Sequence, residues 1–543
     1  MAARARRGRA ARSLHAHLPA HPRGLAHRPR PHVVSLINFR PRWGEGVKSV
    51  GETERANGLA EVRREEERVE ERSAVFRKEL GLTDLVLTQI VFVVGTIWVG
   101  TAAKLGDQQL FFWLLAIITF YLPLAAVVIY LNRLMPLEGG LYQWAKLGFN
   151  EFVGFMVAWN LWVFAILIMS GIGLSVVTNL SYTFEGGRWM AGSKWFITLF
   201  SCALVGAMVA ASTRGLGLGK WVHNAGGVLL LLTFLALVAL PFVSLARGTI
   251  PAYHPFTFAV PAFSLGNADL FKKSLNIYSK MALGALTGFE YVAILAGESK
   301  APARNIGRSV LIAAPVIALM FILGTSSVLA FFRPEEVDLI SPIAQVLSRG
   351  FGLLGAAAAN IVSLVILAVV GRQVALMSIY LTANARLPMV AGWDNLLPAW
   401  FTRLHSKYKT PVNSILLVGV IALALGLLSL VGVGMQEANQ LLDNAGGIFY
   451  ALTYVVLFAI PLFAARRIGL RAPPWLRVAS ASGLLVSLLY IALTVFPIVE
   501  VVSPFAFAAK LIAVTVVFNL AGAGLFHLGR RRAARRAGQP LSA

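Results

Sequence analysis

Charged side chains are scarce in this sequence: they make up 14% of its 543 residues, while hydrophobic residues make up 57%. With a mean hydropathy of +0.70, the chain holds more apolar side chain than a water-soluble domain of this length needs, which excludes a soluble enzyme or binding module. Cysteine is nearly absent as well. The single Cys202 excludes an intramolecular disulfide and a thiolate metal site, and no cofactor is expected.

The sequence is rich in long apolar runs. An α-helix of about 20 residues crosses the ~30 Å hydrocarbon core of a bilayer. Runs of this kind cover residues 84–105, 109–131, 150–180, 193–212, 221–245, 277–297, 309–332, 352–382, 412–432, 443–464, 478–497 and 506–528. The short alternating segments of a membrane β-barrel are absent. The pattern predicts an all-α polytopic membrane protein with about twelve transmembrane helices in one domain over residues 81–530.

The net charge of +24 is concentrated in alternate loops and at the chain ends. Basic residues gather at Arg133 and Lys146, Arg214 and Lys220, Lys300 to Arg308, Arg386 to Lys409, Arg466 to Arg477, and in the tail 531–543. The longer loop from Ala246 to Asn276 is an exception. By the positive-inside rule, both termini are expected in the cytoplasm and the protein in the cytoplasmic membrane. The charge is therefore a topology signal, and the partner is the lipid bilayer and not a nucleic acid.

Residues 1–80 form a separate, charged N-terminal segment that we expect to be disordered and cytoplasmic. Up to Gly44 it contains no acidic residue, and five of the nine histidines lie in it: His15, His17, His21, His27 and His32. Disorder, an organelle transit peptide and a metal site remain alternatives. A further hypothesis is an over-extended reading frame with the true start at a valine codon such as Val47. An intact mass of the expressed protein tests it.

Two apolar runs, the first and the sixth, contain glycines in corresponding positions. The first has Gly95 and Gly100 in mid-span, and the sixth has Gly284 and Gly288. Four runs lie between them, so the first and the sixth cross the membrane in opposite directions. Paired glycine-interrupted segments of opposite topology are typical of transporters with a 5+5 inverted repeat and broken helices 1 and 6. The backbone groups freed by unwinding must line a polar cavity. Close helix packing through small residues is the alternative.

Two charges lie inside predicted membrane helices. Glu290 is ten residues before Lys300, and Arg372 is fourteen residues before Arg386, so each is about 15 to 21 Å from the predicted cytoplasmic end of its helix. Intramembrane charges are costly, so they face a protein interior or water. Glu290 is interpreted either as a proton-coupling, cavity-organising carboxylate or as a structural acid. Arg372 pairs with Glu290, binds a substrate carboxylate or lies in a water-filled vestibule.

Aromatic side chains near the interrupted runs are candidates for a cavity wall, with packing or interface roles as the alternative. They are Trp98, Trp159, Trp162, Phe289 and Tyr291, and Trp98 lies inside the first break. Asp443 and Asn444 begin the tenth run and are predicted to cap its helix.

Three stretches resemble the amino acid–polyamine–organocation permeases. They are MPLEGGLYQWAKLGFNEFVGFMVAWNLW, with Pro136, Gly139, Gly140, Tyr142, Gly154, Phe155 and Trp162; GFEYVAILAGESKAPARNIGRSV, with Gly288, Phe289, Glu290, Glu298, Lys300, Pro302 and Arg304; and NARLPMVAGWDNLLPAWFTRLHSKYKTPVNSI. The resemblance covers about residues 80 to 530. It implies transport of an amino acid or amine by alternating access, with the substrate on the unwound backbones of helices 1 and 6.

The sequence also departs from the family pattern. Where members often carry an aromatic residue four positions before the glycine of helix 6, this chain has Gly284, which implies a wider pocket. The lysine that some proton-coupled members carry in helix 5 is missing from VHNAGGVLLLLTFLALV. The departures favour exchange or proton coupling without that lysine.

The sequence thus predicts a secondary transporter that is not an enzyme. The predicted substrate-binding residues are Gly95, Thr96, Ile97, Trp98, Gly100, Thr101, Trp162, Gly284, Ala285, Thr287 and Gly288, and the predicted coupling or gating residues are Glu290 and Arg372. A membrane enzyme is disfavoured because the histidines are scattered. A channel or a non-transporting sensor on the same fold is the alternative.

Overall fold

The structure is a computed structural model of the chain. It describes residues 80–135, 139–183, 186–214, 216–261, 268–294, 299–393, 410–431, 433–465 and 472–536, with single residues or short stretches in 58–67, 397–408 and 467–469. The chain divides into two compact units, Met1–Ser49 and Val50–Ala543. The described residues all belong to the second unit. The predictions for the first 46 residues and for residues 537–543 lie outside the described part.

The described chain is built from helices, as the apolar runs predict. Ten helical segments are long and apolar enough to cross a membrane: Gly106–Leu134 (η1, α4, η2 and α5), α7 (Glu151–Leu180), α9 (Lys194–Thr213), α10 (Leu216–Ala246), α13 (Pro302–Leu329), α15 (Ala356–Trp393), α16 (Val412–Ser429), α17 with η7 (Met435–Ala464), α18 (Pro474–Leu493) and α19 (Pro504–Arg536). Shorter helices are α6 (Leu141–Gly148), α8 (Arg188–Gly192) and α14 (Pro342–Leu353). The prediction of an all-α membrane protein is confirmed.

The first and sixth predicted runs are the interrupted ones. We call α2 (Leu82–Val93) and α3 (Thr96–Ala103), which bend by 44° at their junction, the first broken helix, and they form an eleventh span. The second broken helix consists of α11 (Ala268–Lys280), a π-helical turn η4 (Met281–Ala285) and α12 (Phe289–Ile294). Every predicted apolar run therefore coincides with a helical element of the structure.

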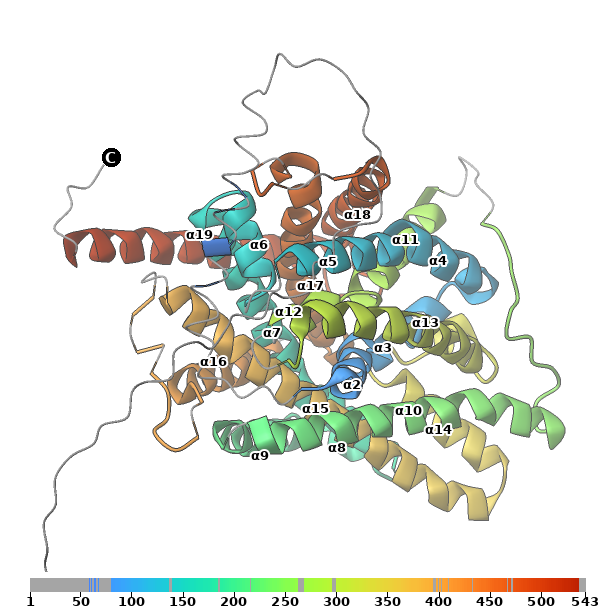
Figure 1. Ribbon diagram of the computed structural model, residues 1–543. Helices are drawn as coiled ribbons and strands as arrows, with labels where there is room; N and C mark the ends of the chain where they lie inside the picture. Colours follow the sequence, from blue (N-terminus) through green and yellow to red (C-terminus); the bar gives the residue numbers. More distant parts are fainter. Residues whose placement is uncertain are drawn as a thin grey trace, which may run out of the picture. The chain divides into compact units, whose positions relative to one another are not determined.

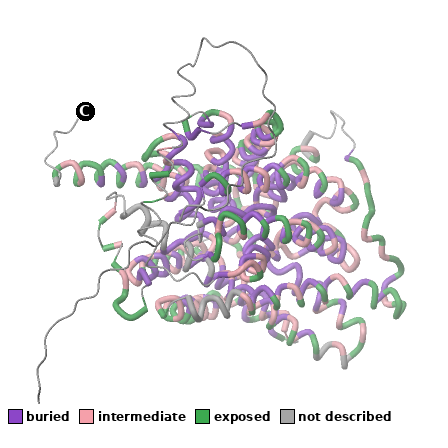
Figure 2. Tube along the Cα trace, in the orientation of Figure 1, coloured by how far each residue is buried: buried purple, intermediate pink, exposed green. Residues whose placement is uncertain are grey.

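The two broken helices lie side by side in the interior. α2 contacts α12, and α3 contacts both α11 and η4 (Figure 1). One parallel bridge joins Leu80, just before the first broken helix, to Ser299, just after the second, and Lys300 N donates to Leu80 O at 2.9 Å. Around them, α7 packs against α15 and α17, and α10 packs along α2 and α15. Buried residues concentrate on these central elements (Figure 2).

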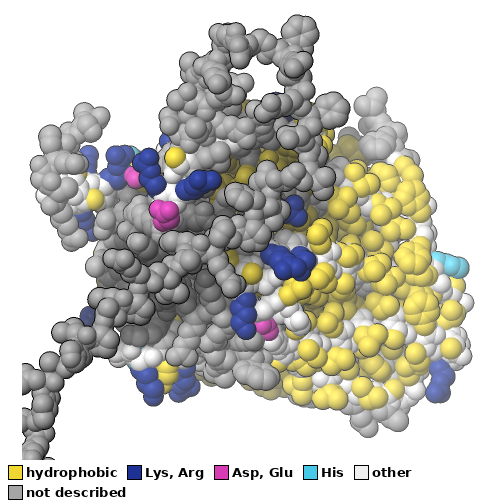
Figure 3. Space-filling model, viewed as in Figure 1, with side chains coloured by type: hydrophobic (Ala, Val, Ile, Leu, Met, Phe, Trp, Pro, Cys, Tyr) yellow, Lys and Arg dark blue, Asp and Glu magenta, His cyan; other side chains and the backbone are white. Residues whose placement is uncertain are grey.

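The outer faces of the surrounding helices are apolar. Leu235 on α10, Val420 on α16 and Leu520 on α19 are each 65–67% exposed. Hydrophobic side chains form a broad continuous surface over the side of α10 and α13 (Figure 3). Exposed leucine and valine on this scale are unfavourable in water and are typical of the outer surface of a membrane protein.

Candidate functional site

The break in the first broken helix is short and exposes backbone. α2 ends at Val93, Val94 and Gly95 leave the helical conformation, and α3 begins at Thr96. The Val94 carbonyl accepts a hydrogen bond at 3.2 Å from Arg372 Nη1 of α15. A buried guanidinium thus satisfies a carbonyl that the helix break would otherwise leave without a partner.

The break in the second broken helix needs glycine. After η4, residues Leu286–Gly288 leave the helix, and Gly288 has φ +121°, a conformation that side chains rarely adopt. A Cβ at Gly288 would also lie 2.4 Å from Phe92 Cδ1. The freed Gly288 N–H donates to the Tyr454 hydroxyl at 3.1 Å.

Glu290, two residues after Gly288, is hydrogen-bonded to helix α17. Its carboxylate accepts hydrogen bonds from the hydroxyls of Tyr450 and Tyr454, the latter at 2.7 Å, and its exposure is 0%. Tyr454 therefore links the Gly288 backbone to the Glu290 side chain. An ion pair with Glu290 was one of three interpretations of Arg372, and it is not found among the described residues. Arg372 Nη1 donates to Val94 O, and the Glu290 carboxylate accepts from Tyr450 and Tyr454.

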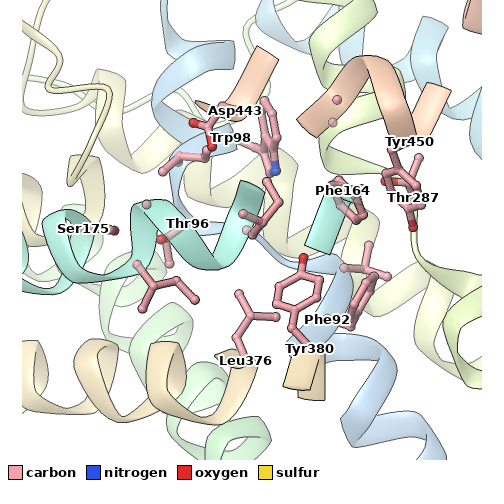
Figure 4. A pocket seen from close by; sticks show the side chains of 18 of the residues that line it. Phe92, Thr96, Trp98, Phe164, Ser175, Thr287, Leu376, Tyr380, Asp443 and Tyr450 are labelled. Carbon is pink, nitrogen blue, oxygen red and sulfur yellow. The ribbon is translucent and has the colours of Figure 1, made fainter. Parts of the chain in front are cut away.

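A cavity of about 120 Å³ lies between the two breaks. Its lining comes from the two broken helices and from α7, α15, α17 and α18: Phe92, Val93, Gly95, Thr96, Ile97, Trp98, Phe164, Ile168, Gly171, Ile172, Ser175, Leu283, Gly284, Thr287, Arg372, Gln373, Leu376, Tyr380, Asn439, Asp443, Gly447, Tyr450 and Tyr490. Figure 4 shows Phe164, Tyr380 and Tyr450 around this space. An apolar wall with a few polar groups is the usual form of a small-molecule site.

Seven of the predicted site residues line this cavity: Gly95, Thr96, Ile97, Trp98, Gly284, Thr287 and Arg372. The others are not part of its lining. Gly100 packs against Pro342, where a Cβ would approach to 2.7 Å, and the Thr101 hydroxyl donates to Ile97 O. Ala285 is buried, and the Trp162 ring packs against that of Trp159 at 5.3 Å. The structure thus brings together the two breaks and Arg372, while Gly288 and Glu290 lie just behind the wall.

The space next to Gly284 is filled by an aromatic ring from the other broken helix. A Cβ at Gly284 would lie 2.3 Å from Trp98 Cη2, and one at Gly95 would lie 2.6 Å from Trp98 Cδ1. The absence of an aromatic residue at position 284 therefore does not widen the cavity there. The Trp98 indole is wedged between the two breaks.

Two polar residues of the site were predicted to have another role. Asp443 and Asn444 do not cap the tenth helix, because α17 begins at Met435 after Gly434 and contains both in its interior. The prediction was wrong because the polar segment MQEANQ, which precedes the apolar run, is helical and forms the start of α17. Gln436, Asn439, Gln440 and Asp443 recur at helical spacing and line the cavities, so that periodicity was the signal that could have located them.

A wider hollow of about 440 Å³ lies beyond the end of α3. Lys104, Tyr182, Glu335, Glu336 and Asp338 line it, and the Tyr182 hydroxyl donates to Asp338 Oδ2 at 2.8 Å. Burial, followed by the Asp338 charge, raises the pKa of Tyr182. Burial, followed by the neighbouring charge of Lys273, lowers the pKa of Lys104. Ile340 and Gln436 line both this hollow and a smaller cavity of about 30 Å³.

The fold and the cavity are those of a membrane transporter, and comparison with known proteins gives the family. The family model described as amino acid permease matches residues 80–518, so the chain belongs to that family. An uncharacterized transporter from Legionella pneumophila is 23% identical over 385 residues, covering 70% of this chain and 80% of the relative. The aspartate/glutamate permease AcaP from Lactococcus lactis is 23% identical over 375 residues, covering 66% and 74%.

A solved structure has the same fold. MhsT in complex with L-phenylalanine superposes with a TM-score of 0.52 over 76% of this chain and 97% of that protein, at 15% identity. This likeness confirms the predicted transporter fold. Together with the family it makes the protein an amino acid transporter of the amino acid permease family.

Proposed function

We propose that the protein is a secondary active transporter that moves an amino acid or a related amine across the cytoplasmic membrane by alternating access. The observation that carries this proposal is that residues at the breaks of both broken helices line one central cavity. At the first break the N–H groups that start α3 attract a carboxylate, and at the second the carbonyls that end η4 attract an ammonium group. Such a pair of sites fits a zwitterion.

Arg372 adds a cation to the carboxylate end of this cavity. Its Nη1 donates to Val94 O beside the first break, while its Nε has no hydrogen-bond partner among the described residues. A substrate carboxylate is the partner that such a buried guanidinium fits best. Arg372 thus supports both the broken backbone and the ligand.

Glu290 is proposed to hold the second broken helix to α17. Its two tyrosine hydrogen bonds fix the backbone that follows Gly288, so that the carbonyls before the break keep one orientation. Rocking one half of the fold against the other would then open the cavity to alternate sides.

Two measurements test this function. In a thermal-shift assay of the detergent-solubilised protein with the protein amino acids, γ-aminobutyrate and polyamines, a ligand at a hundred times its Kd should stabilise the fold by about 2.7 kcal/mol. In proteoliposomes, uptake should saturate and distinguish L from D forms. Uptake that is linear in concentration and indifferent to stereochemistry would indicate a channel. Stabilisation without uptake would indicate a sensor.

A further inference from the structure

Two charged residues of the helical interior, the buried Lys280 and the half-buried Asp443, lie outside the predicted coupling residues. Lys280 ends α11 of the second broken helix and is 3% exposed. Asp443 lies two turns into α17. The two attract each other electrostatically, although the described residues contain no ion pair between them within contact distance. Intramembrane charges of this kind are rare and costly, which points to a function.

The ammonium group of Lys280 is fixed in place by polar contacts. Lys280 Nζ donates to Asn444 Oδ1 at 2.5 Å and to Thr494 Oγ1 at 3.2 Å, and it lies 5.8 Å from the Tyr490 ring centre. Asn444 Nδ2 in turn donates to Thr494 O at 2.8 Å. The neighbours thus hold the cation next to Asp443 by oxygen atoms and a ring face.

Asp443 separates two cavities. It lines the central cavity and also a second cavity of about 30 Å³, whose wall includes Lys280 and Asn444. Ile97, Trp98 and Asn439 line both cavities as well, and Asn439 Nδ2 donates to Asp443 Oδ2 at 3.0 Å. The second cavity is large enough to hold water. The carboxylate is therefore partly accessible although it lies deep in the protein.

Among the titratable groups around the central cavity, Asp443 is the one placed to take up and release a proton. Tyr380 of α15 and Tyr490 of α18 lie within electrostatic range, and Arg372 and Tyr450 line the same central cavity. Lys280 faces it from α11. Among the described residues, Asp443 is the carboxylate that lines the central cavity, whereas Glu290 lies behind the wall with both oxygens bonded to tyrosines.

We propose that the Asp443 carboxylate binds the proton that this protein couples to substrate movement, with Lys280 as its fixed counter-ion. The inference rests on the proposed transport function and specifies its coupling ion. The proton adds to a carboxylate oxygen from one side of the membrane, giving a carboxylic acid, and Lys280 keeps its own proton. Release to the other side restores the carboxylate. Each cycle then carries one positive charge with a zwitterionic substrate.

The arrangement selects a proton over a metal cation. The side-chain oxygens of Asn444 and Thr494, which could otherwise bind Na⁺, already accept hydrogen bonds from Lys280 Nζ. A fixed ammonium next to the carboxylate also repels a second cation, but a covalently bound proton neutralises the carboxylate itself.

Protonation would act on the second broken helix. Lys280 directly precedes the π-helical turn η4, and Asp443 borders Trp98, whose ring rests on Gly284 in that turn. Figure 4 shows Asp443 and Trp98 next to each other. Neutral Asp443 no longer attracts Lys280, so α11 is less firmly held to α17. Proton binding is thereby linked to the elements that must move.

The test uses full-length protein in proteoliposomes and a radiolabelled mixture of the protein amino acids as the probe. With the outside one pH unit below the inside, steady-state accumulation should rise about tenfold, because one pH unit is worth about 1.4 kcal/mol per proton. Asp443→Asn should abolish this accumulation while exchange of internal for external amino acid continues. Asp443→Glu should retain it.

Two further variants are controls for misfolding and for a nonspecific loss of transport. Lys280→Met combined with Asp443→Asn removes both charges and leaves neither buried alone, and it should behave as the single Asp443 variant does. Glu437→Gln removes another acid of α17, whose Oε2 accepts from Val502 N, and it should keep the full response to the pH gradient.

A second readout does not depend on transport. In pH-difference infrared spectra, Asp443→Asn should remove one protonated-carboxyl band that Glu437→Gln leaves in place. Wild-type accumulation that ignores the pH gradient, or an Asp443→Asn variant that accumulates as the wild type does, would overturn the proton site. If the band titrates and vanishes with Asp443→Asn while no amino acid is transported, the proton site is supported and the proposed transport function fails.

Discussion

The indole of Trp98 in one broken helix rests on Gly284 in the other, with no room for a methyl group between them: a Cβ at Gly284 would lie 2.3 Å from Trp98 Cη2. The contact joins the two elements that are expected to move during transport. It also lies between the central cavity and the second cavity of about 30 Å³, because Trp98 lines both. The pair is therefore placed to close the substrate site from the side of α3.

Gly284→Ala should displace the Trp98 ring and lower apparent substrate affinity, with little effect on global stability because an indole edge can move. The atom nearest to the added methyl is Cη2, which lies at the far end of the Trp98 side chain. Uptake kinetics in proteoliposomes measure the change in KM. Combining it with Trp98→Leu should restore much of the affinity lost.

Gly206→Ala on α9 is the matched control, since nothing lies within 4 Å of a Cβ there. A Gly284→Ala variant with the wild-type KM would show that the ring contact does not shape the site.

Gly288→Ala should be more harmful than Gly284→Ala. Its φ of +121° disfavours any side chain, and a Cβ would meet Phe92 at 2.4 Å. We expect a loss of stability of about 1–3 kcal/mol together with loss of uptake, since the strain acts on the backbone of the break. Detergent-solubilised melting curves and uptake assays measure both. Equal effects of the two glycine substitutions would contradict the assigned backbone strain.

Tyr454→Phe should weaken the attachment of the second broken helix to α17. It removes the donor to Glu290 and the acceptor for Gly288 N–H, so we expect destabilisation of about 1–3 kcal/mol from the buried groups left unpaired. Tyr253→Phe is a matched control, because the Tyr253 hydroxyl has no hydrogen-bond partner in the described part of the chain. The melting temperature of this variant should stay unchanged or rise. A Tyr454→Phe protein as stable as the wild type would refute the linkage.

Glu290 and Arg372 should behave as independent sites in a double-mutant cycle. Their hydrogen bonds go to α17 and to Val94 O respectively, so the effects of Glu290→Gln and Arg372→Ala on stability should add within about 0.5 kcal/mol. Glu290→Gln and Tyr454→Phe share one network and should deviate from additivity by more than that. Partial rescue of Arg372→Ala by Glu290→Gln would restore the pairing hypothesis.

The positions of the helices and of both breaks were predictable because they depend on local sequence. A run of apolar residues must become a helix in lipid, where every backbone group needs an internal partner. Gly288 interrupts its helix because it is the residue type that tolerates positive φ. Arg372 and Glu290 were recognised because a charge within an apolar run is conspicuous against its neighbours.

What only the tertiary structure decided is which of these groups meet. Tyr454 and Glu290 are 164 residues apart, and Lys280 and Asn444 are also 164 apart, so their contacts depend on packing between distant helices. Asp443 was predicted to cap a helix because the residues before it are polar. Gln436, Asn439 and Gln440 among them are helical and line a cavity between helices. The sequence by itself determined which segments cross the membrane and where two of them unwind. Packing decided that Trp98 fills the space at Gly284 and that Asp443, with Lys280 beside it, is the acid that lines the cavity, because a side chain's partners come from every helix that surrounds it.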